Sequence, residues 1–143
     1  MEIRESEKLG IAAQITSVDF PAIMERMRNT VARSHDRMKE AMKKTEEFDY
    51  YGGEAQFTGD HTLEVNGKTV KGKAVFIAAG ARPMVPAIRG MEGVEYLTNE
   101  GALRLAELPE SMVIIGGGYI AAEFAHFFEA MGTTVTIIQR NKR

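Results

Sequence analysis

The segment of residues 111–140, SMVIIGGGYIAAEFAHFFEAMGTTVTIIQR, constrains the fold of this chain more than any other. The apolar run at 112–115 predicts a short buried strand, residues 118–131 a helix, and residues 134–138 a second strand. Gly132 follows the last helical residue and predicts the end of that helix. Parallel strands need such a helical crossover, so the segment predicts a strand–helix–strand unit and an α/β fold.

Glycines fill the turn between the first strand and the helix. Gly116, Gly118 and Ala121 follow the G-x-G-x-x-A spacing of a dinucleotide fingerprint. In that fingerprint the first glycine permits a tight turn, the second lets a pyrophosphate approach the backbone, and the third small residue lets helix and strand lie close. The N–H groups at the helix start then bind the phosphates. We therefore predict a dinucleotide site, and expect the helix phenylalanines in the core: Phe124, Phe127 and Phe128.

The residue after the second strand indicates which nucleotide binds. NAD-selective sites have an acidic residue about 20 positions past the glycines, where it binds the ribose hydroxyls and repels a 2′-phosphate. Here Gln139 takes that place and Arg140 follows, with Lys142 and Arg143 beyond it. An arginine can hold a phosphate through two parallel hydrogen bonds. The pattern favours NADP, with NAD and a merely solvated basic loop as the alternatives.

Residues 1–48 predict helix. Residues 2–9 suggest a helical segment that ends at Gly10, and Asp19 with Pro21 predicts the cap and first turn of a helix over residues 21–47. Apolar residues recur along this helix at multiples of helical spacing, which predicts a core-facing stripe: Ile23, Met27, Val31, Met38 and Met42. Acidic and basic residues alternate between them, which favours a solvated, salt-bridged face over a polyanion-binding one.

Residues 49–81 predict strands. A strand is expected at 50–57, and Asn66-Gly67 predicts a hairpin between strands at 62–65 and 69–71. The apolar run at 74–78 predicts a strand buried on both faces. Three of the four prolines lie within residues 82–110, which predicts a connecting segment with a short helix at 99–108.

Composition excludes several classes of function. The net charge of −2 argues against a nucleic-acid partner, and the absence of cysteine removes disulfides and thiolate chemistry from this chain. The charged N-terminus resembles no signal peptide, and no apolar stretch predicts a membrane span, so a cytoplasmic protein is expected. His35, His61 and His126 lie on different predicted elements without ligand spacing, so no metal site is expected.

Three motifs in this order resemble the pyridine nucleotide-disulfide oxidoreductases, which are FAD flavoenzymes such as dihydrolipoamide dehydrogenase, mercuric reductase and glutathione reductase. The segment ELPESMVIIGGGYIAAEFAHFFEAMGTTVTII is similar to the entry of their NAD(P) domain. FIAAGARP resembles their second FAD fingerprint, and YYGGEAQF with the VNG hairpin resembles the strand beside the FAD adenine. The resemblance implies an α/β, partial FAD/NAD(P)-binding Rossmann-like fold with a long N-terminal helix and a small antiparallel β-sheet.

The resemblance also implies roles for single residues. Ala55 is expected beside the FAD adenine, and Ala79 and Gly80 beside the flavin nucleotide, with Ala79 in place of the family's usual threonine. The pyridine-nucleotide loop is expected to comprise Gly116, Gly118, Tyr119, Ile120 and Ala121, with Gln139 and Arg140 at the ribose. Tyr119 and Glu123 are the catalytic candidates, as the aromatic that covers the nicotinamide and the acid beside that pocket. The residues alone favour a partly exposed packing role for Tyr119 and a solvent-facing acid on an amphipathic helix for Glu123.

The resemblance implies a domain division at residue 87. Residues 1–87 correspond to part of the FAD-binding domain, with a helical region at 1–48 and a β region at 49–81, and residues 88–143 to the first half of the NAD(P)-binding domain. The family's redox cysteines, first FAD glycine motif and dimerisation domain are not found in this sequence. We therefore expect an internal piece of a longer enzyme that is inactive by itself. Its expected partners are the rest of the parent chain and a second copy of the protein, which would form a homodimer or associate through exposed sheet edges.

The expected function is that of a flavin-dependent NAD(P)H:disulfide oxidoreductase, most like dihydrolipoamide dehydrogenase. Hydride would pass between nicotinamide and FAD, coupled to a dithiol or disulfide outside this chain, with a small-molecule disulfide as substrate. The alternative is a non-catalytic dinucleotide-binding module, which the zero cysteine count favours for this polypeptide taken alone.

Overall fold

A computed structural model of the 143-residue chain describes residues 2–140, with side chains from residue 6 onward. The chain forms two compact units. One comprises residues 1–30 and 85–143, and the other residues 31–84. These units are defined by contacts within this chain. The predicted division at residue 87 refers to the domains of a longer parent protein, and it stays a prediction.

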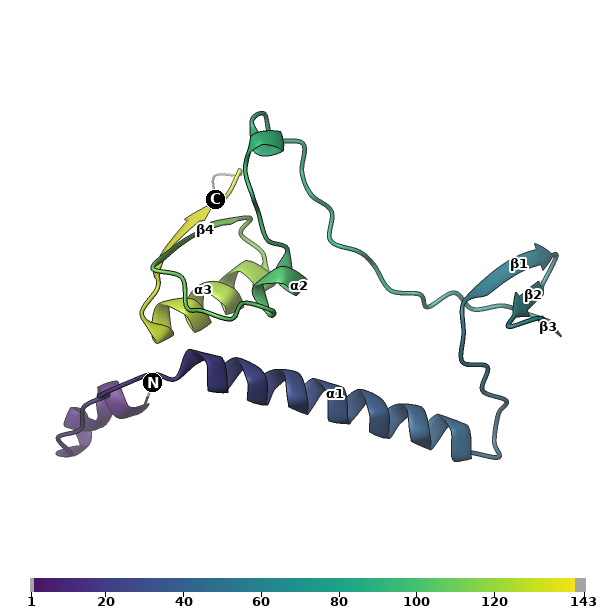
Figure 1. Ribbon diagram of the computed structural model, residues 1–143, viewed down its shortest axis with the longest axis horizontal. Coiled ribbons are helices and arrows are strands. Elements are labelled where there is room, and N and C mark those ends of the chain that lie inside the picture. Colours follow the sequence, from purple (N-terminus) through teal and green to yellow (C-terminus); the bar gives the residue numbers. More distant parts are fainter. Residues whose placement is uncertain (1, 141–143) are drawn as a thin grey trace. The chain divides into compact units, whose positions relative to one another are not determined.

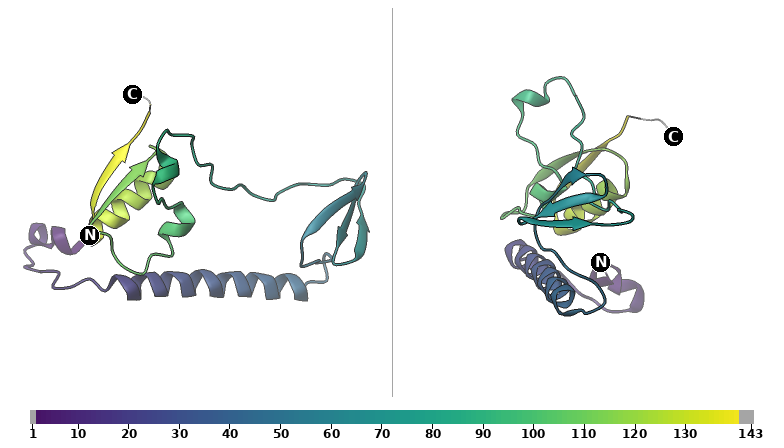
Figure 2. Two further views of the ribbon diagram at one scale, coloured as in Figure 1. Left: turned by 45° about the horizontal axis from the view of Figure 1, so that its top comes forward. Right: turned by 90° about the vertical axis from the view of Figure 1, so that its right-hand side faces the viewer.

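The first unit contains the predicted strand–helix–strand segment. β4 (Ser111–Ile115) and β5 (Thr134–Ile138) pair in parallel from Ser111 opposite Thr134 to Ile115 opposite Ile138, and α3 (Tyr119–Met131) connects them. Figure 2 shows the two strands side by side with α3 against them. Gly132 ends α3 with φ of 114°, and the N–H groups of Gly132 and Thr133 both donate to the Phe128 carbonyl. The predicted unit and its helix stop are confirmed.

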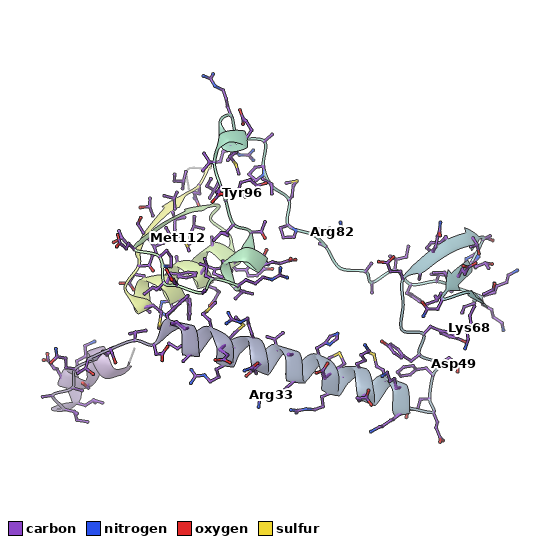
Figure 3. All side chains as sticks on the ribbon, in the orientation of Figure 1. Arg33, Asp49, Lys68, Arg82, Tyr96 and Met112 are labelled. Atoms are coloured by element: carbon purple, nitrogen blue, oxygen red, sulfur yellow. The ribbon has the colours of Figure 1, made fainter. Side chains whose placement is uncertain are left out.

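The core of this unit lies between α3 and the start of α1 (Phe20–Lys44). Phe20, Met24, Ala102 and Phe128 form its buried centre. Partly buried apolar residues surround them: Met27, Leu105, Leu108, Met112, Phe124, Phe127, Met131 and Val135. Met112, which is labelled in Figure 3, belongs to β4 and packs against this cluster. The three helix phenylalanines are therefore core residues, as predicted.

Helix α1 begins as its sequence predicts. The Ala22 N–H donates to Asp19 Oδ1 at 3.0 Å, so Asp19 is the N-cap acceptor. The preceding helical segment, η1 (Glu2–Leu9), is a 3-10 helix, and Gly10 ends it with φ of 74°. At its other end α1 stops at Lys44 and does not reach residue 47.

The predicted apolar stripe of α1 is buried only near its start. Ile23 and Met27 are half-buried, whereas Val31 is 61% and Met38 62% exposed, so the prediction of a continuous core-facing stripe is wrong for the second half. An amphipathic pattern shows that a helix has an apolar face, but it does not supply the surface that would cover that face. The charged face is solvated as predicted, because Lys43 Nζ lies 3.0 Å from Glu40 Oε1 at the surface and this hydrogen bond raises the Lys43 pKa.

The second unit contains a small antiparallel sheet of β1 (Ala55–Gly59), β2 (Thr62–Val65) and β3 (Lys68–Lys71), in that order (Figure 1). Asn66 and Gly67 have φ values of 52° and 75°, so the predicted two-residue hairpin turn is confirmed. The strand predicted at 50–57 begins only at Ala55. The Asn66 side-chain amide donates to the Gly52 carbonyl at 2.9 Å. The backbone at Gly52 is therefore hydrogen-bonded to a side chain and not to a neighbouring strand.

The apolar run at 74–78 forms no strand, which corrects the prediction of a strand buried on both faces. Phe76 is 94% and Ile77 76% exposed. A strand forms only against a partner, and among residues 2–140 none pairs with this run. A 3-10 turn, η2 (Met91–Gly93), follows within the connecting segment.

The helix predicted at 99–108 is shorter than expected. α2 (Asn99–Ala102) is a single turn, after which Arg104 N–H bonds to Gly101 and Leu105 N–H to Ala102 in a 3-10 pattern. Leu105 and Leu108 still pack against the core. Within residues 2–140, no helix has the length and apolar character needed to cross a membrane.

Candidate nucleotide-binding site

The glycine loop between β4 and α3 has open space in front of its backbone. A Cβ built on Gly116 or on Gly118 would meet no atom within 4 Å. Gly116 has φ of 128°, which side chains rarely adopt, and Gly118 is the extended N-cap residue of α3. The first N–H groups of a helix lack partners within it and lie at its positive end. The loop therefore presents backbone donors to a space that an anion could enter.

The end of β5 lies directly beside this loop. The Gly116 N–H donates to the Ile138 carbonyl at 2.8 Å, which extends the parallel pairing beyond the two strands. The next residue, Gln139, is exposed and its side chain lies against Gly117. Arg140 follows, also exposed, while Lys142 and Arg143 lie outside the described residues. Gln139 is thus at the loop, and its role in selecting a nucleotide stays a prediction.

The residues of the α3 N-terminus differ in exposure. Ala121 is 8% exposed, which agrees with a small residue where helix and strand pack closely. Tyr119 is 81% and Ile120 44% exposed, and Glu123 is exposed as well. Tyr119 and Glu123 are four positions apart on α3 and so share one helix face. Two side chains with aromatic and acidic chemistry therefore lie on the same accessible surface, next to the glycine loop.

The residues expected at FAD belong to the other compact unit. Ala55 opens β1, where it pairs with Val65. Ala79 and Gly80 lie in the irregular segment after β3, both exposed, and Gly80 has φ of 74° with no atom within 4 Å of a built Cβ. The Gly80 backbone is thus accessible, as a cofactor contact requires. The part of the chain that the structure describes has no cluster of three or more His, Cys, Asp or Glu side chains suited to a metal ion.

The sequence analysis assigned no role to Gly117, the middle glycine of the loop. The fingerprint leaves position 117 unassigned, yet a Cβ there would overlap the Gln139 side chain. The signal was present in the sequence as an uninterrupted triple glycine, Gly116-Gly117-Gly118, where the spacing requires only two.

The pyridine nucleotide-disulphide oxidoreductase family matches residues 5–143 of this chain. The chain belongs to that family. Its fold is accordingly α/β, a part of the FAD/NAD(P)-binding Rossmann-like fold with a long helix and a small antiparallel sheet. Members of this pyridine nucleotide-disulphide oxidoreductase family are enzymes, and the family implies FAD and a pyridine nucleotide as cofactors.

Known family members match most of the chain. A mercuric reductase of Staphylococcus aureus is 49% identical over 96 residues, which is 67% of this chain and 18% of the relative. A dihydrolipoyl dehydrogenase of Chlamydia muridarum is 28% identical over 99% of this chain and 31% of its own length. The structure of the HOCl-induced flavoprotein disulfide reductase RclA from Escherichia coli superposes with a TM-score of 0.71 at 30% identity, covering 94% of this chain and 30% of that one. The chain thus spans less than a third of each.

Proposed function

We propose that this chain forms the pyridine-nucleotide entry and part of the FAD site of a flavin-dependent NAD(P)H:disulfide oxidoreductase. The observation that supports this most is the open space in front of Gly116 and Gly118 at the positive end of α3. When bound, the nicotinamide supplies a hydride and FAD accepts it, with a dithiol or disulfide outside this chain as the coupled pair. The residues of this chain bind and orient these groups.

Each candidate residue has a proposed role. The loop from Gly116 to Ala121 holds the pyrophosphate through the backbone N–H groups that follow Gly116, because the Gly116 N–H itself donates to Ile138. Tyr119 covers the nicotinamide pocket and Glu123 lies beside it, which agrees with their shared, exposed helix face. In the second unit, Ala55, Ala79 and Gly80 contact FAD through their backbones; the accessible Gly80 supports this.

We propose NADPH as the preferred nucleotide, with NADH second. No carboxylate is placed at Gln139 to repel a 2′-phosphate, and the guanidinium of Arg140 is exposed at the adjacent position. This preference argues against a dihydrolipoamide dehydrogenase, which the sequence resemblance first suggested and which typically uses NAD. The higher identity to a mercuric reductase also favours a reductase of that kind, with lipoamide ranked second as acceptor.

We also propose a cytoplasmic homodimer. Members of this family are typically homodimers, and β4 and β5 form a sheet of only two strands among the described residues. A non-catalytic nucleotide-binding module remains the second candidate, because the chain contains no cysteine to exchange electrons with a flavin.

The test is the ratio of kcat/KM for NADPH and NADH, measured on the full-length protein with a disulfide or mercuric ion as acceptor. We expect NADPH to be preferred by about tenfold or more, which corresponds to about 1.4 kcal/mol. A tenfold preference for NADH would overturn the assignment of NADPH, and binding of nucleotide without any turnover would support the non-catalytic module.

A further inference from the structure

Asn66 makes a contact that its place in the hairpin turn does not require. Its side-chain amide donates to the Gly52 carbonyl at 2.9 Å, between residues that are 14 positions apart in the chain. Aspartate or glycine would form the same two-residue turn with Gly67. Neither of them has a side-chain donor at neutral pH, so asparagine alone of the three makes both the turn and this hydrogen bond.

The Asn66 amide also lies against the backbone of Gly53. A Cβ built on Gly53 would be 2.6 Å from both Nδ2 and Oδ1 of Asn66 and 2.8 Å from its Cγ. An alanine at position 53 would therefore displace the whole amide group and break its hydrogen bond to Gly52. The φ of Gly53 is outside the left-handed range, so the space taken by the Asn66 amide, and not the backbone conformation, favours glycine there.

This hydrogen bond lies where the chain enters β1. Ala55, the first residue of β1, pairs with Val65, the last residue of β2, and Asn66 follows Val65 directly. The bond from Asn66 to Gly52 thus continues the contact between the two strands beyond their last paired residues. It ties the irregular segment before β1 to the hairpin and opposes separation of the strands at the Ala55 end.

We propose that Asn66 is a positioning residue for the FAD site. Its amide holds the Gly52-Gly53 segment on the hairpin and so keeps the backbone at Ala55 in place for the cofactor. The inference rests on the proposed contact of Ala55 with FAD, and it adds a residue that does not itself touch FAD. If the start of β1 opens part of the time, only the closed fraction binds, and the apparent dissociation constant for FAD rises by the inverse of that fraction.

The first measurement tests the hydrogen bond in the full-length protein without FAD. Asn66→Gly removes the donor and adds a glycine, whereas Gly53→Ala displaces the amide and removes a glycine. The two variants have opposite effects on the freedom of the unfolded chain and share the loss of the bond. Each should speed hydrogen exchange of the backbone amides at the start of β1 by about fivefold, and the double variant should exceed neither, because one bond is lost only once.

The second measurement is the dissociation constant of FAD for the same proteins, followed by flavin fluorescence. Asn66→Gly and Gly53→Ala should each raise it about two- to fivefold, the upper value applying if the start of β1 is then mostly open. With saturating FAD the KM for NADPH should be unchanged, because the pyridine-nucleotide loop belongs to the other compact unit. Gly59→Ala is the matched control in β1, since a Cβ there comes no nearer than 3.8 Å to Thr62, and it should change neither exchange nor FAD binding.

Two results would overturn the inference. Additive effects of Asn66→Gly and Gly53→Ala would mean that no shared bond links them. Faster exchange with an unchanged dissociation constant for FAD would limit Asn66 to stabilising the hairpin. If Gly53→Ala does not fold, Asn66→Gly must still raise both quantities, and wild-type values there contradict the proposal. A wild-type protein that binds no FAD would instead overturn the proposed function, and the inference with it.

Discussion

Phe20, the first residue of α1, packs against Phe128 of α3 with ring centroids 6.2 Å apart and an interplanar angle of 39°. The two residues are 2% and 0% exposed. Phe127 adds a near-perpendicular contact to Phe128 at 5.2 Å. Aromatic pairs of this kind stabilise a core beyond the area they bury. The cluster packs the start of α1 against α3, the helix that follows the glycine loop. The core therefore holds the helix from which the candidate site begins.

Replacing Phe128 by alanine should destabilise the chain strongly. Loss of a fully buried phenylalanine removes its apolar burial and leaves a cavity, so Phe128→Ala should lower the free energy of unfolding by about 3–5 kcal/mol. The measurement is denaturant unfolding followed by circular dichroism. Phe57→Ala is the control, since Phe57 in β1 is 51% exposed and its loss should cost about 1 kcal/mol or less. Equal effects of the two substitutions would contradict this account of the core.

The cap of α1 should contribute measurably to stability. Asp19 Oδ1 accepts a hydrogen bond from the Ala22 N–H at 3.0 Å, so Asp19→Ala should lower the free energy of unfolding by about 1 kcal/mol. Asp19→Asn keeps a side-chain oxygen acceptor and is the matched control, expected to lie within a few tenths of a kcal/mol of wild type. An equal loss of stability in both variants would mean that the charge of Asp19, and not its hydrogen bond to Ala22, stabilises the helix.

Arg140 should contribute to the binding of NADPH and little to that of NADH. Its guanidinium is exposed after β5, and removal of a charged phosphate partner should raise the KM for NADPH about tenfold in the full-length protein carrying Arg140→Gln. The KM for NADH should change by about twofold or less, because NADH lacks the 2′-phosphate. Arg104→Gln removes another exposed arginine, after α2, and serves as control. A uniform rise for both nucleotides would assign Arg140 to the pyrophosphate instead.

The 143-residue chain alone should not reduce disulfides. It contains no cysteine, so electrons that reach a flavin would find no dithiol in this polypeptide to accept them. The assay follows NADH or NADPH oxidation with lipoamide, using the full-length protein as positive control. Turnover by the purified chain above the rate without protein would show the prediction wrong.

Local rules in the sequence were sufficient for the elements that depend only on near neighbours. The strand–helix–strand unit, its stop at Gly132 and the turn at Asn66-Gly67 all follow from apolar spacing and from residues that accept positive φ. The cap at Asp19 is equally local, because donor and acceptor are three residues apart. The glycine loop between β4 and α3 belongs to this class, because its turn at Gly116 and the helix start after Gly118 depend on near neighbours.

Contacts between distant residues were decided only by the tertiary structure. The run at 74–78 has the composition of a buried strand, but a strand needs a partner, and the described residues provide none. Val31 and Met38 follow the same periodicity as Met27, yet of these three only Met27 packs against the core cluster. The position of the Gln139 side chain against Gly117 likewise depends on where β5 ends beside the loop. Sequence patterns specify which face of an element is apolar and where a chain can turn, whereas folding alone determines which surfaces come together.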